Sequence, residues 1–183
     1  MKILGTRVNS NLSWNENCDA IIKKVNARMQ LLRSVQSFGA SPEEMTHLWV
    51  VFGRSVLEQS CVVWHSSLTK ENVEDLERTQ KTFTKMVLKE KYEHYENALI
   101  NLNLESLESR RKYLCEKFAK SGIKYNKLQD LFPENNKYRK METRDQEKYT
   151  VQFANTNRLK NSSIVTMQNY LNEDEKRRKT NFG

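Results

Sequence analysis

Glycine and proline are scarce in this sequence, which has five of the first and two of the second among its 183 residues. Sandwiches and barrels of β-strands need many turns, and turns rely on these two residues. Their scarcity therefore argues against an all-β fold and favours long helices. The fold class that we expect is mainly α: a small bundle of four to five helices with one N-terminal strand and a partly disordered basic C-terminal extension.

Long apolar runs are also lacking, since hydrophobic residues make up only 37% of the chain. No run reaches the roughly 20 residues that a helix needs to cross a bilayer. The first residues lead at once to Gly5, Thr6 and Arg7, instead of to the apolar segment of a signal peptide. We therefore expect an intracellular protein, in the nucleus or the cytoplasm, without a membrane partner.

Cysteine and histidine offer no framework for a metal site or for catalysis. Cys18, Cys61 and Cys115 are far apart and form no CxxC pair, which is typical of reduced cysteines in a core. His65 follows Cys61 at a spacing that suits two metal ligands, or a nucleophile and its base. A second ligand pair and an orienting third group are both lacking. We predict no catalytic residue, no metal, no cofactor and no small-molecule substrate in this chain.

Lysine and arginine, in contrast, are abundant. The chain has 31 of them against 23 Asp and Glu, which gives a formal net charge of +8. A polyanion such as nucleic acid is a natural partner for a chain of this charge. A helical protein with a lysine-rich solvated surface has the same composition, so charge alone leaves both interpretations open.

The stretch 41–81 contains the most apolar helix that the sequence predicts. Ser41, Pro42 and Glu44 form a helix start, with a capping box and a proline in the first turn. A short extended crossing is expected at 61–65, where the residues are apolar and β-branched, and Thr69 caps the next helix. Helical spacing predicts inner faces with Met45, Leu48, Trp49, Phe52 and Val56 in the first helix and Val73, Leu76, Phe83 and Val87 in the second.

The N-terminal part is expected to form one strand over 2–8 and then a long helix. Ser13 and Glu16 have the spacing of a capping box, and the helix should run to about Gln36, with Gly39 as its C-terminal stop. We expect the inner face of this helix to contain Ile21, Ile22, Val25, Met29 and Leu32.

The C-terminal half is expected to contain short helices and poorly ordered segments. Helices are predicted at 95–102, 106–128 and 163–176, and a short strand at 151–154. The segment 134–149 is polar enough for disorder. The domains that follow are 1–12, a strand and turn; 13–132, a helical domain; and 133–183, a basic extension. The apolar stripe predicted for 106–128 contains Leu107, Leu114, Phe118 and Tyr125.

Basic residues recur at helical spacing, which places them on single helix faces. Such stripes suit phosphate backbones, because each neutralised phosphate releases counterions. A run of four cations, Lys176–Lys179, has three interpretations: a nuclear-import patch, a phosphate contact or a solvated tail. The candidate nucleic-acid contacts are Arg110, Lys117, Lys120, Lys124 and Lys127; Arg78, Lys81, Lys85 and Lys89; and, as a weaker set, Lys23, Lys24 and Arg28.

Several short strings resemble one known family, in order and at family-like spacing over nearly the whole chain. They are Leu12-Ser-Trp-Asn-Glu16, Arg54-Ser-Val-Leu-Glu58, Val63-Trp-His-Ser-Ser-Leu-Thr-Lys70, Leu76-Glu-Arg78, Lys117-Phe-Ala-Lys120, Leu131-Phe-Pro133 and Asn157-Arg-Leu-Lys-Asn-Ser162. Together they resemble the region after the palm in non-LTR (LINE-type) retrotransposon endonuclease-reverse transcriptases.

The resemblance implies a thumb-like fragment of an RNA-directed DNA polymerase that contacts template RNA or an RNA–DNA hybrid. The rest of the reverse transcriptase polypeptide would be a further partner. Polymerisation in that family needs palm aspartates that hold divalent metal ions, with Mg²⁺ expected there. The aspartates of this chain are isolated along the sequence, so we expect it to be inactive alone. A helical protein–protein interaction module and a non-functional remnant of such an element stay open as alternatives.

Overall fold

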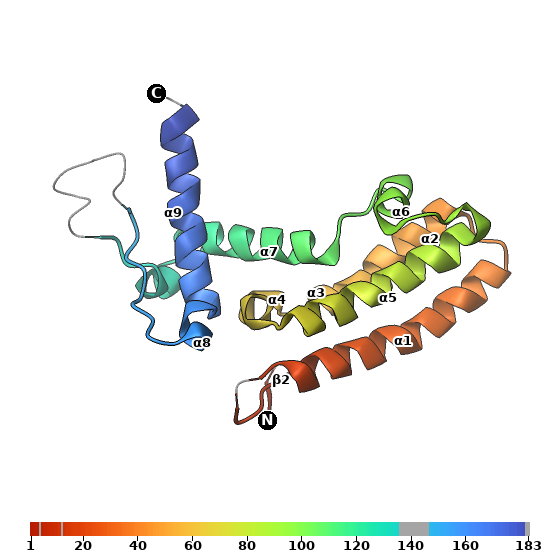
Figure 1. The fold of residues 1–183 in the computed structure, drawn as a ribbon, viewed down its shortest axis with the longest axis horizontal. Coiled ribbons are helices and arrows are strands. Elements are labelled where there is room, and N and C mark those ends of the chain that lie inside the picture. The colour runs from red at the N-terminus through yellow and green to blue at the C-terminus, as the bar shows by residue number, and fades with distance from the viewer. Residues whose placement is uncertain (4, 12, 136–146, 182–183) are drawn as a thin grey trace. The chain divides into compact units, whose positions relative to one another are not determined.

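The computed structural model describes residues 1–3, 5–11, 13–135 and 147–181 (Figure 1). They form two compact units, one of residues 1–61 and 68–111 and the other of residues 62–67 and 112–183. The range 13–132, expected from the sequence to be one helical domain, contributes residues to both units. The mainly α fold that the scarcity of glycine and proline predicts is confirmed.

Helices dominate both units. The first unit contains strands β1 (Lys2–Ile3) and β2 (Thr6–Arg7) and helices α1 (Asn15–Ser37), α2 (Pro42–Leu48), α3 (Ser55–Glu58), α5 (Lys70–Leu88) and α6 (Tyr95–Asn101), with a π-helical segment Trp49–Arg54 and a 3₁₀ turn Lys89–Lys91. Helices α4 (Cys61–Trp64) and α7 (Leu107–Gly122) each contain residues of both units. The second unit also contains 3₁₀ segments His65–Ser67 and Asn126–Leu131 and helices α8 (Asn157–Lys160) and α9 (Ser163–Asn181).

The N-terminal strand predicted over 2–8 is two short strands that pair with each other. Lys2 lies opposite Arg7 and Ile3 opposite Thr6 in an antiparallel ladder. Gly5, with φ 88°, turns the chain between them, and this left-handed conformation is one that glycine adopts without a steric penalty. The prediction of a single strand was wrong because Gly5 turns the chain in the middle of the predicted segment.

Helix α1 begins at Asn15, without the predicted capping box. Trp14 occupies the cap position with no side-chain hydrogen bond, and the backbone N–H of Ser13 instead donates to Oδ1 of Asn9 at 2.8 Å. The helix ends before Gly39, whose φ of 91° confirms the predicted stop. Figure 1 shows α1 running alongside α5, against which it packs. Its buried apolar residues are Cys18, Ile21, Val25, Met29 and Leu32, while Ile22 is half-buried.

The capping box at the start of α2 is confirmed. The backbone N–H of Ser41 donates to Oε2 of Glu44 at 2.8 Å, and the N–H of Glu44 donates to Oγ of Ser41 at 3.2 Å. Farther along, the segment Trp49–Arg54 is π-helical, so each turn takes about one residue more than in an α-helix. The buried face therefore shifts from Phe52, which is exposed, to Gly53.

Gly53 leaves the space that the Trp49 indole fills. A Cβ atom at position 53 would lie 2.2 Å from Cε3 of Trp49. The indole is fully buried and stacks on the ring of Phe83, with ring centroids 4.5 Å apart and ring planes 9° apart. The side chain of residue 53 must therefore be absent for Trp49 to reach α5.

The extended crossing predicted at 61–65 is helical, as α4 and the 3₁₀ turn that follows it. Ser60, with φ 54°, interrupts the helical conformation between α3 and α4. The direction change thus occurs at one left-handed residue, and the β-branched residues after it need no extended conformation. Thr69 caps α5 as predicted, because its Oγ1 accepts from the backbone N–H of Asn72 at 3.2 Å.

Helix α7 is shorter than predicted and buries a different face. It ends at Gly122 instead of near 128. The predicted stripe residues Phe118 and Tyr125 are exposed, and Leu114 is half-buried. Apolar spacing failed because an arginine and small residues occupy the inner positions. The buried positions are Leu107, Arg111, Cys115, Ala119 and Gly122.

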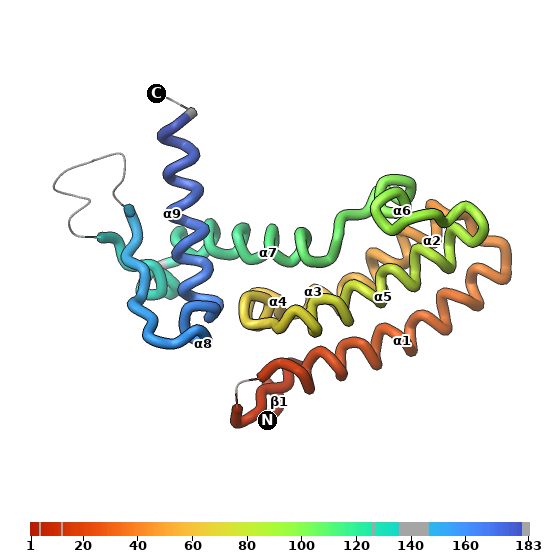
Figure 2. Tube along the Cα trace, viewed as in Figure 1, coloured from red at the N-terminus to blue at the C-terminus, as the bar shows by residue number. Residues whose placement is uncertain are grey.

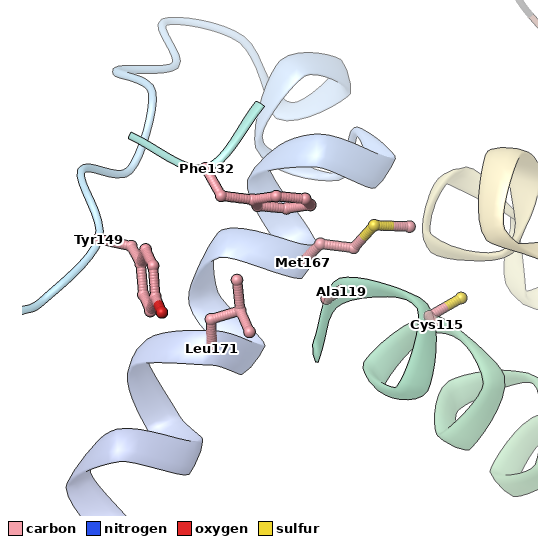
Figure 3. Close-up of a cluster of buried hydrophobic side chains, with 6 residues drawn as sticks. All are labelled: Cys115, Ala119, Phe132, Tyr149, Met167 and Leu171. Carbon is pink, nitrogen blue, oxygen red and sulfur yellow. The ribbon is translucent and has the colours of Figure 1, made fainter. Parts of the chain in front are cut away.

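The core of the second unit forms between α7 and α9. Figure 3 shows Met167 and Leu171 of α9 facing the same cluster as Ala119 of α7, with Phe132 and Tyr149 from the segments between them. The predicted terminal helix is confirmed as α9. The segment 134–149, predicted to be disordered, lies largely outside the described residues, which stop at 135 and resume at 147.

Two amide side chains of α9 hold the segment that precedes α8, in place of the strand predicted at 151–154. Asn172 accepts from the backbone N–H of Tyr149 at 2.9 Å and donates to the Tyr149 carbonyl at 3.0 Å. Gln168, one turn earlier, accepts from the N–H of Gln152 at 2.9 Å. Figure 2 shows this light-blue segment continuing toward α8. Side chains of α9 thus bond backbone groups of Tyr149 and Gln152, while the N–H of Thr150 donates to the carbonyl of Pro133 at 2.8 Å.

We predict that Gly53→Ala destabilises the chain by about 3 kcal/mol, since the new methyl group overlaps a buried ring that cannot move without losing its stacking on Phe83. Urea denaturation measures the free energy of unfolding. Gly39→Ala is the matched control: it has open space around it and a strained φ, and should cost about 1 kcal/mol. Equal losses in the two variants would contradict the role given to the indole.

Candidate nucleic-acid interface

The predicted basic stripe of 106–128 is not one continuous helix face. Lys117 and Lys120 lie on α7, but the helix ends at Gly122, so Lys124 and Lys127 lie in the turn and 3₁₀ segment after it. Lys117, Lys124 and Lys127 are exposed, and we call them the exposed lysine set. In the part of the chain that the structure describes, no carboxylate forms an ion pair with any of the three.

Two members of the predicted stripe are engaged in structural ion pairs. Nε of Arg110 is 3.1 Å from Oε1 of Glu58, and Nε of Arg54 is 3.2 Å from the same oxygen. Nζ of Lys120 donates to Oδ1 of Asp174 at 2.6 Å. This hydrogen bond lowers the pKa of Asp174 below the usual carboxyl range. Arg110 and Lys120 therefore hold elements together and are weaker candidates for phosphate contact than the exposed lysine set.

The basic face of α5 remains exposed and has aromatic neighbours. Nζ of Lys81 lies 5.1 Å from the ring centroid of Tyr95, and Nζ of Lys85 lies 5.3 Å from that of Tyr92. Arg78 forms an exposed ion pair with Asp75 at 2.7 Å. The sequence predicted the cations and missed the tyrosines, because they come from the segment that follows α5 in the chain.

The weaker candidates on α1 include two exposed lysines and one arginine that has a structural hydrogen bond. Lys23 and Lys24 are exposed. A guanidinium nitrogen of Arg28 donates to the backbone carbonyl of Phe52 in the π-helical segment. Arg28 thus contributes to the packing of α1 against the π-helical segment, and the two lysines stay available to solvent.

A fully buried amide, that of Gln80 on α5, connects four parts of the first unit. Its Oε1 accepts from the indole Nε1 of Trp49 at 3.1 Å. Its Nε2 donates to the hydroxyl of Tyr95 at 3.0 Å and to the backbone carbonyl of Glu105 at 2.9 Å. Both polar atoms of the Gln80 amide therefore have hydrogen-bond partners, as buried polar groups require.

Glu77 extends this network to the start of α7. It accepts a short hydrogen bond from the Tyr95 hydroxyl, and the backbone N–H groups of Leu107 and Glu108 donate to its two oxygens at 3.1 and 3.3 Å. A carboxylate at this position stabilises the positive end of the helix dipole. Burial and the bond to Glu77 raise the pKa of Tyr95 well above its usual range, so the phenol stays protonated.

Arg111, one turn farther along α7, is fully buried. Burial lowers the pKa of its guanidinium, while the charge of Glu77 opposes this effect. Sequence spacing placed apolar residues at the inner face of α7, so this buried charge was missed. A signal existed in the four-residue spacing, because Arg111 lies one turn after Leu107 and one turn before Cys115, both of which are buried.

Three cations of the run 176–179 form ion pairs with acidic residues: Lys176, Arg177 and Arg178. Nζ of Lys176 lies 3.6 Å from Oε1 of Glu147, and a guanidinium nitrogen of Arg178 lies 2.9 Å from Oδ2 of Asp174. Arg177 lies 3.7 Å from Glu173, one turn earlier. The nearby acidic residues reduce the positive potential of this run, which makes it a weaker phosphate site than its sequence suggests.

The described residues contain neither a metal-ligand cluster nor a membrane-spanning helix. Among these residues no three His, Cys, Asp or Glu side chains gather as ligands for a metal ion. None of the helices that the structure describes combines the length and the apolar content needed to cross a membrane. All three cysteines are buried, and burial raises the pKa of Cys18 to about 11.

Comparisons with protein-family models, curated proteins and solved structures found no match to this chain.

We predict that Gln80→Leu destabilises the chain by about 2–4 kcal/mol, because it leaves the Trp49 indole N–H and the Glu105 carbonyl without their buried partner. Chemical denaturation measures the loss. Gln30→Leu, an exposed substitution on α1, is the control and should stay within about 0.5 kcal/mol of the parent chain. A Gln80→Leu variant as stable as this control would show that the network does not stabilise the fold.

We also predict a pH dependence from the Lys120–Asp174 pair. A carboxyl whose pKa is lowered on folding contributes stability above its unfolded value, about 3.9, and that contribution disappears as the pH falls through the folded value. The stability advantage of the parent chain over Asp174→Asn should therefore shrink as the pH falls from about 5 to below 3. Asp130→Asn, at an exposed position, should show no such trend.

Proposed function

We propose that this chain is the thumb-like region of a non-LTR retrotransposon reverse transcriptase and binds template RNA or an RNA–DNA hybrid. The ordered strings that resemble this family support the proposal, as does the net charge of +8. Metal-dependent polymerisation belongs to a palm that this sequence does not contain. The contribution of this chain is to hold the nucleic acid by electrostatic attraction and to position it.

The observation that carries the proposal is the exposed lysine set. Lys117, Lys124 and Lys127 are exposed within a short stretch of the second unit, and no ion pair with a described carboxylate neutralises them. The nearby cations of α9, in contrast, are largely engaged by Glu147, Glu173 and Asp174. Cations that already have carboxylate partners gain less from a phosphate, so the exposed set is the stronger electrostatic site.

We expect the triple variant Lys117→Ala, Lys124→Ala, Lys127→Ala to bind single-stranded RNA more weakly and with a shallower salt dependence. If all three lysines contact phosphates, the slope of log affinity against log salt should decrease by about 2. Fluorescence anisotropy at several salt concentrations measures both quantities, with single-stranded RNA, duplex DNA and an RNA–DNA hybrid as ligands.

The matched control changes the net charge by the same amount at scattered exposed positions: Arg33→Ala, Lys70→Ala and Lys160→Ala. Its salt slope should stay close to that of the parent chain. Equal slopes in the two triple variants would assign binding to general charge and not to the exposed lysine set. A folded parent chain that binds none of the three nucleic acids would overturn the proposed function.

A protein–protein interaction module is the second candidate, and one observation favours it. Phe38, at the end of α1, is 89% exposed and borders an open hollow with Val35 and Leu48. An apolar surface of this kind suits a protein partner. A folded chain that ignores RNA and forms a dimer that Phe38→Ser dissociates would support this candidate over the first.

A further inference from the structure

Two lysines of α5, the lysine that follows this helix and two nearby tyrosines form a second candidate surface, separate from the exposed lysine set. We call Lys81, Lys85, Lys89, Tyr92 and Tyr95 the lysine–tyrosine surface. The lysines are exposed and the two tyrosines are half-buried. Lys81 lies over the Tyr95 ring and Lys85 over the Tyr92 ring, at distances typical of a cation–π interaction. Each pair thus presents a cation in front of an aromatic face.

We infer that the lysine–tyrosine surface binds single-stranded RNA, with bases stacked on Tyr92 and Tyr95 and phosphates on the lysines. The inference rests on the proposed function and adds to it the strand state of the ligand and the residues that contact the bases. Flexible lysine side chains can move from the ring to a neighbouring phosphate, which opens the ring face to a base. A combination of aromatic platforms and cations is how proteins bind single strands without reading their sequence.

The geometry of α5 suits successive nucleotides. Lys81 and Lys85 are four residues apart, which is about 6 Å along the helix axis and similar to the spacing of phosphates in an extended strand. The hydroxyl of Tyr95 is held by Glu77 and by Gln80, so its ring orientation is fixed before a base arrives. A platform that is already ordered loses less conformational entropy on binding.

Nearby carboxylates favour a single strand over a duplex. Glu90, Glu93 and Glu96 are exposed on the segment that contains the two tyrosines, so the local excess of positive charge is small. A duplex offers only phosphates and paired, inaccessible base faces to such a surface. A single strand also offers its base faces, and base–aromatic stacking does not depend on net charge.

Lys89 has a backbone conformation that glycine would adopt more easily. It ends α5 with φ 50° and ψ −119°, at a position where helices commonly use glycine. A residue in a strained backbone conformation is a candidate for function. Lys89 also borders an open hollow of about 510 Å³ together with Met45, Val87 and Lys91, on the side of the first unit where α5 ends. A lysine here extends the row of cations on α5 toward Tyr92.

The first experiment compares Tyr92→Leu with Phe153→Leu, which removes a more exposed ring from a segment of the second unit. The probe is a labelled 12-nucleotide single-stranded RNA, and a strand of the same length with abasic nucleotides keeps the phosphates and lacks the bases. Circular dichroism establishes that each variant is folded. We expect Tyr92→Leu to lower the affinity for RNA roughly 5- to 50-fold with an unchanged salt slope, as loss of one stacked base predicts.

The parent chain should bind the abasic strand more weakly than RNA, and Tyr92→Leu should reduce this difference. Phe153→Leu should bind like the parent chain. If Tyr92→Leu binds RNA as the parent chain does, or if the abasic strand binds as tightly as RNA, the inference is wrong and the proposed electrostatic function still stands. If the folded parent chain binds no nucleic acid, both are overturned.

The second experiment uses Lys89→Gly, a variant expected to gain stability. Relief of the strained φ should raise the melting temperature by a few degrees, while loss of one phosphate contact should lower the salt slope for single-stranded RNA by about 0.7. Asn103→Gly, at φ 49°, is the control: it also places a glycine at a positive φ and keeps every cation. An unchanged slope in Lys89→Gly would exclude Lys89 from the surface.

Discussion

The first unit depends on one buried side-chain amide. Gln80 is fully buried and has hydrogen-bond partners on the π-helical segment, on α6 and in the loop before α7. An apolar residue in its place would pack, but it would fix neither the indole of Trp49 nor the hydroxyl of Tyr95. Because a buried polar group is costly unless all its partners are in place, the amide admits few alternative packings of these elements. The positions of Tyr95, and therefore of the cation above it, follow from this constraint.

Local signals in the sequence predicted what local chemistry determines. The capping box at Ser41 and Glu44 and the cap at Thr69 formed as expected, since each needs only residues three positions apart. The box predicted at Ser13 and Glu16 did not form, because α1 begins at Asn15 and the backbone N–H of Ser13 donates to Asn9 instead. Other predictions failed where a residue of another segment decides. Phe52 is exposed because the π-helical turn sets Gly53 against Trp49, whose indole stacks on Phe83 of α5. The burial of Arg111 in α7, with the charge of Glu77 on another helix favouring its charged form, is likewise a feature of the folded chain. The spacing of residues within one segment predicts neither the exposure of Phe52 nor the burial of Arg111.

The sequence predicted which cations belong to the candidate interface, but not which of them have partners in the folded chain. The sequence identified the cations of α5 and of 110–127, but ion pairs remove Arg110 and Lys120 from the available set. Their partners, Glu58 and Asp174, lie 52 and 54 positions away in the chain. The tyrosines beside Lys81 and Lys85 come from the segment after the helix, so only the folded chain brings them together. The net charge favours the nucleic-acid partner that we propose, and these contacts decide which cations are available to bind it.

The close approach of Trp49 to Gly53 also constrains how this sequence can change over time. A larger residue at position 53 collides with the indole, and a smaller residue at position 49 leaves a cavity against Phe83. Either substitution alone should lower the stability of the fold. A larger residue at position 53 combined with a smaller one at position 49 keeps the total side-chain volume similar. Positions 49 and 53 therefore behave as one unit of variation: among sequences that share this fold, a glycine at 53 should accompany a tryptophan at 49, and the pair should vary jointly.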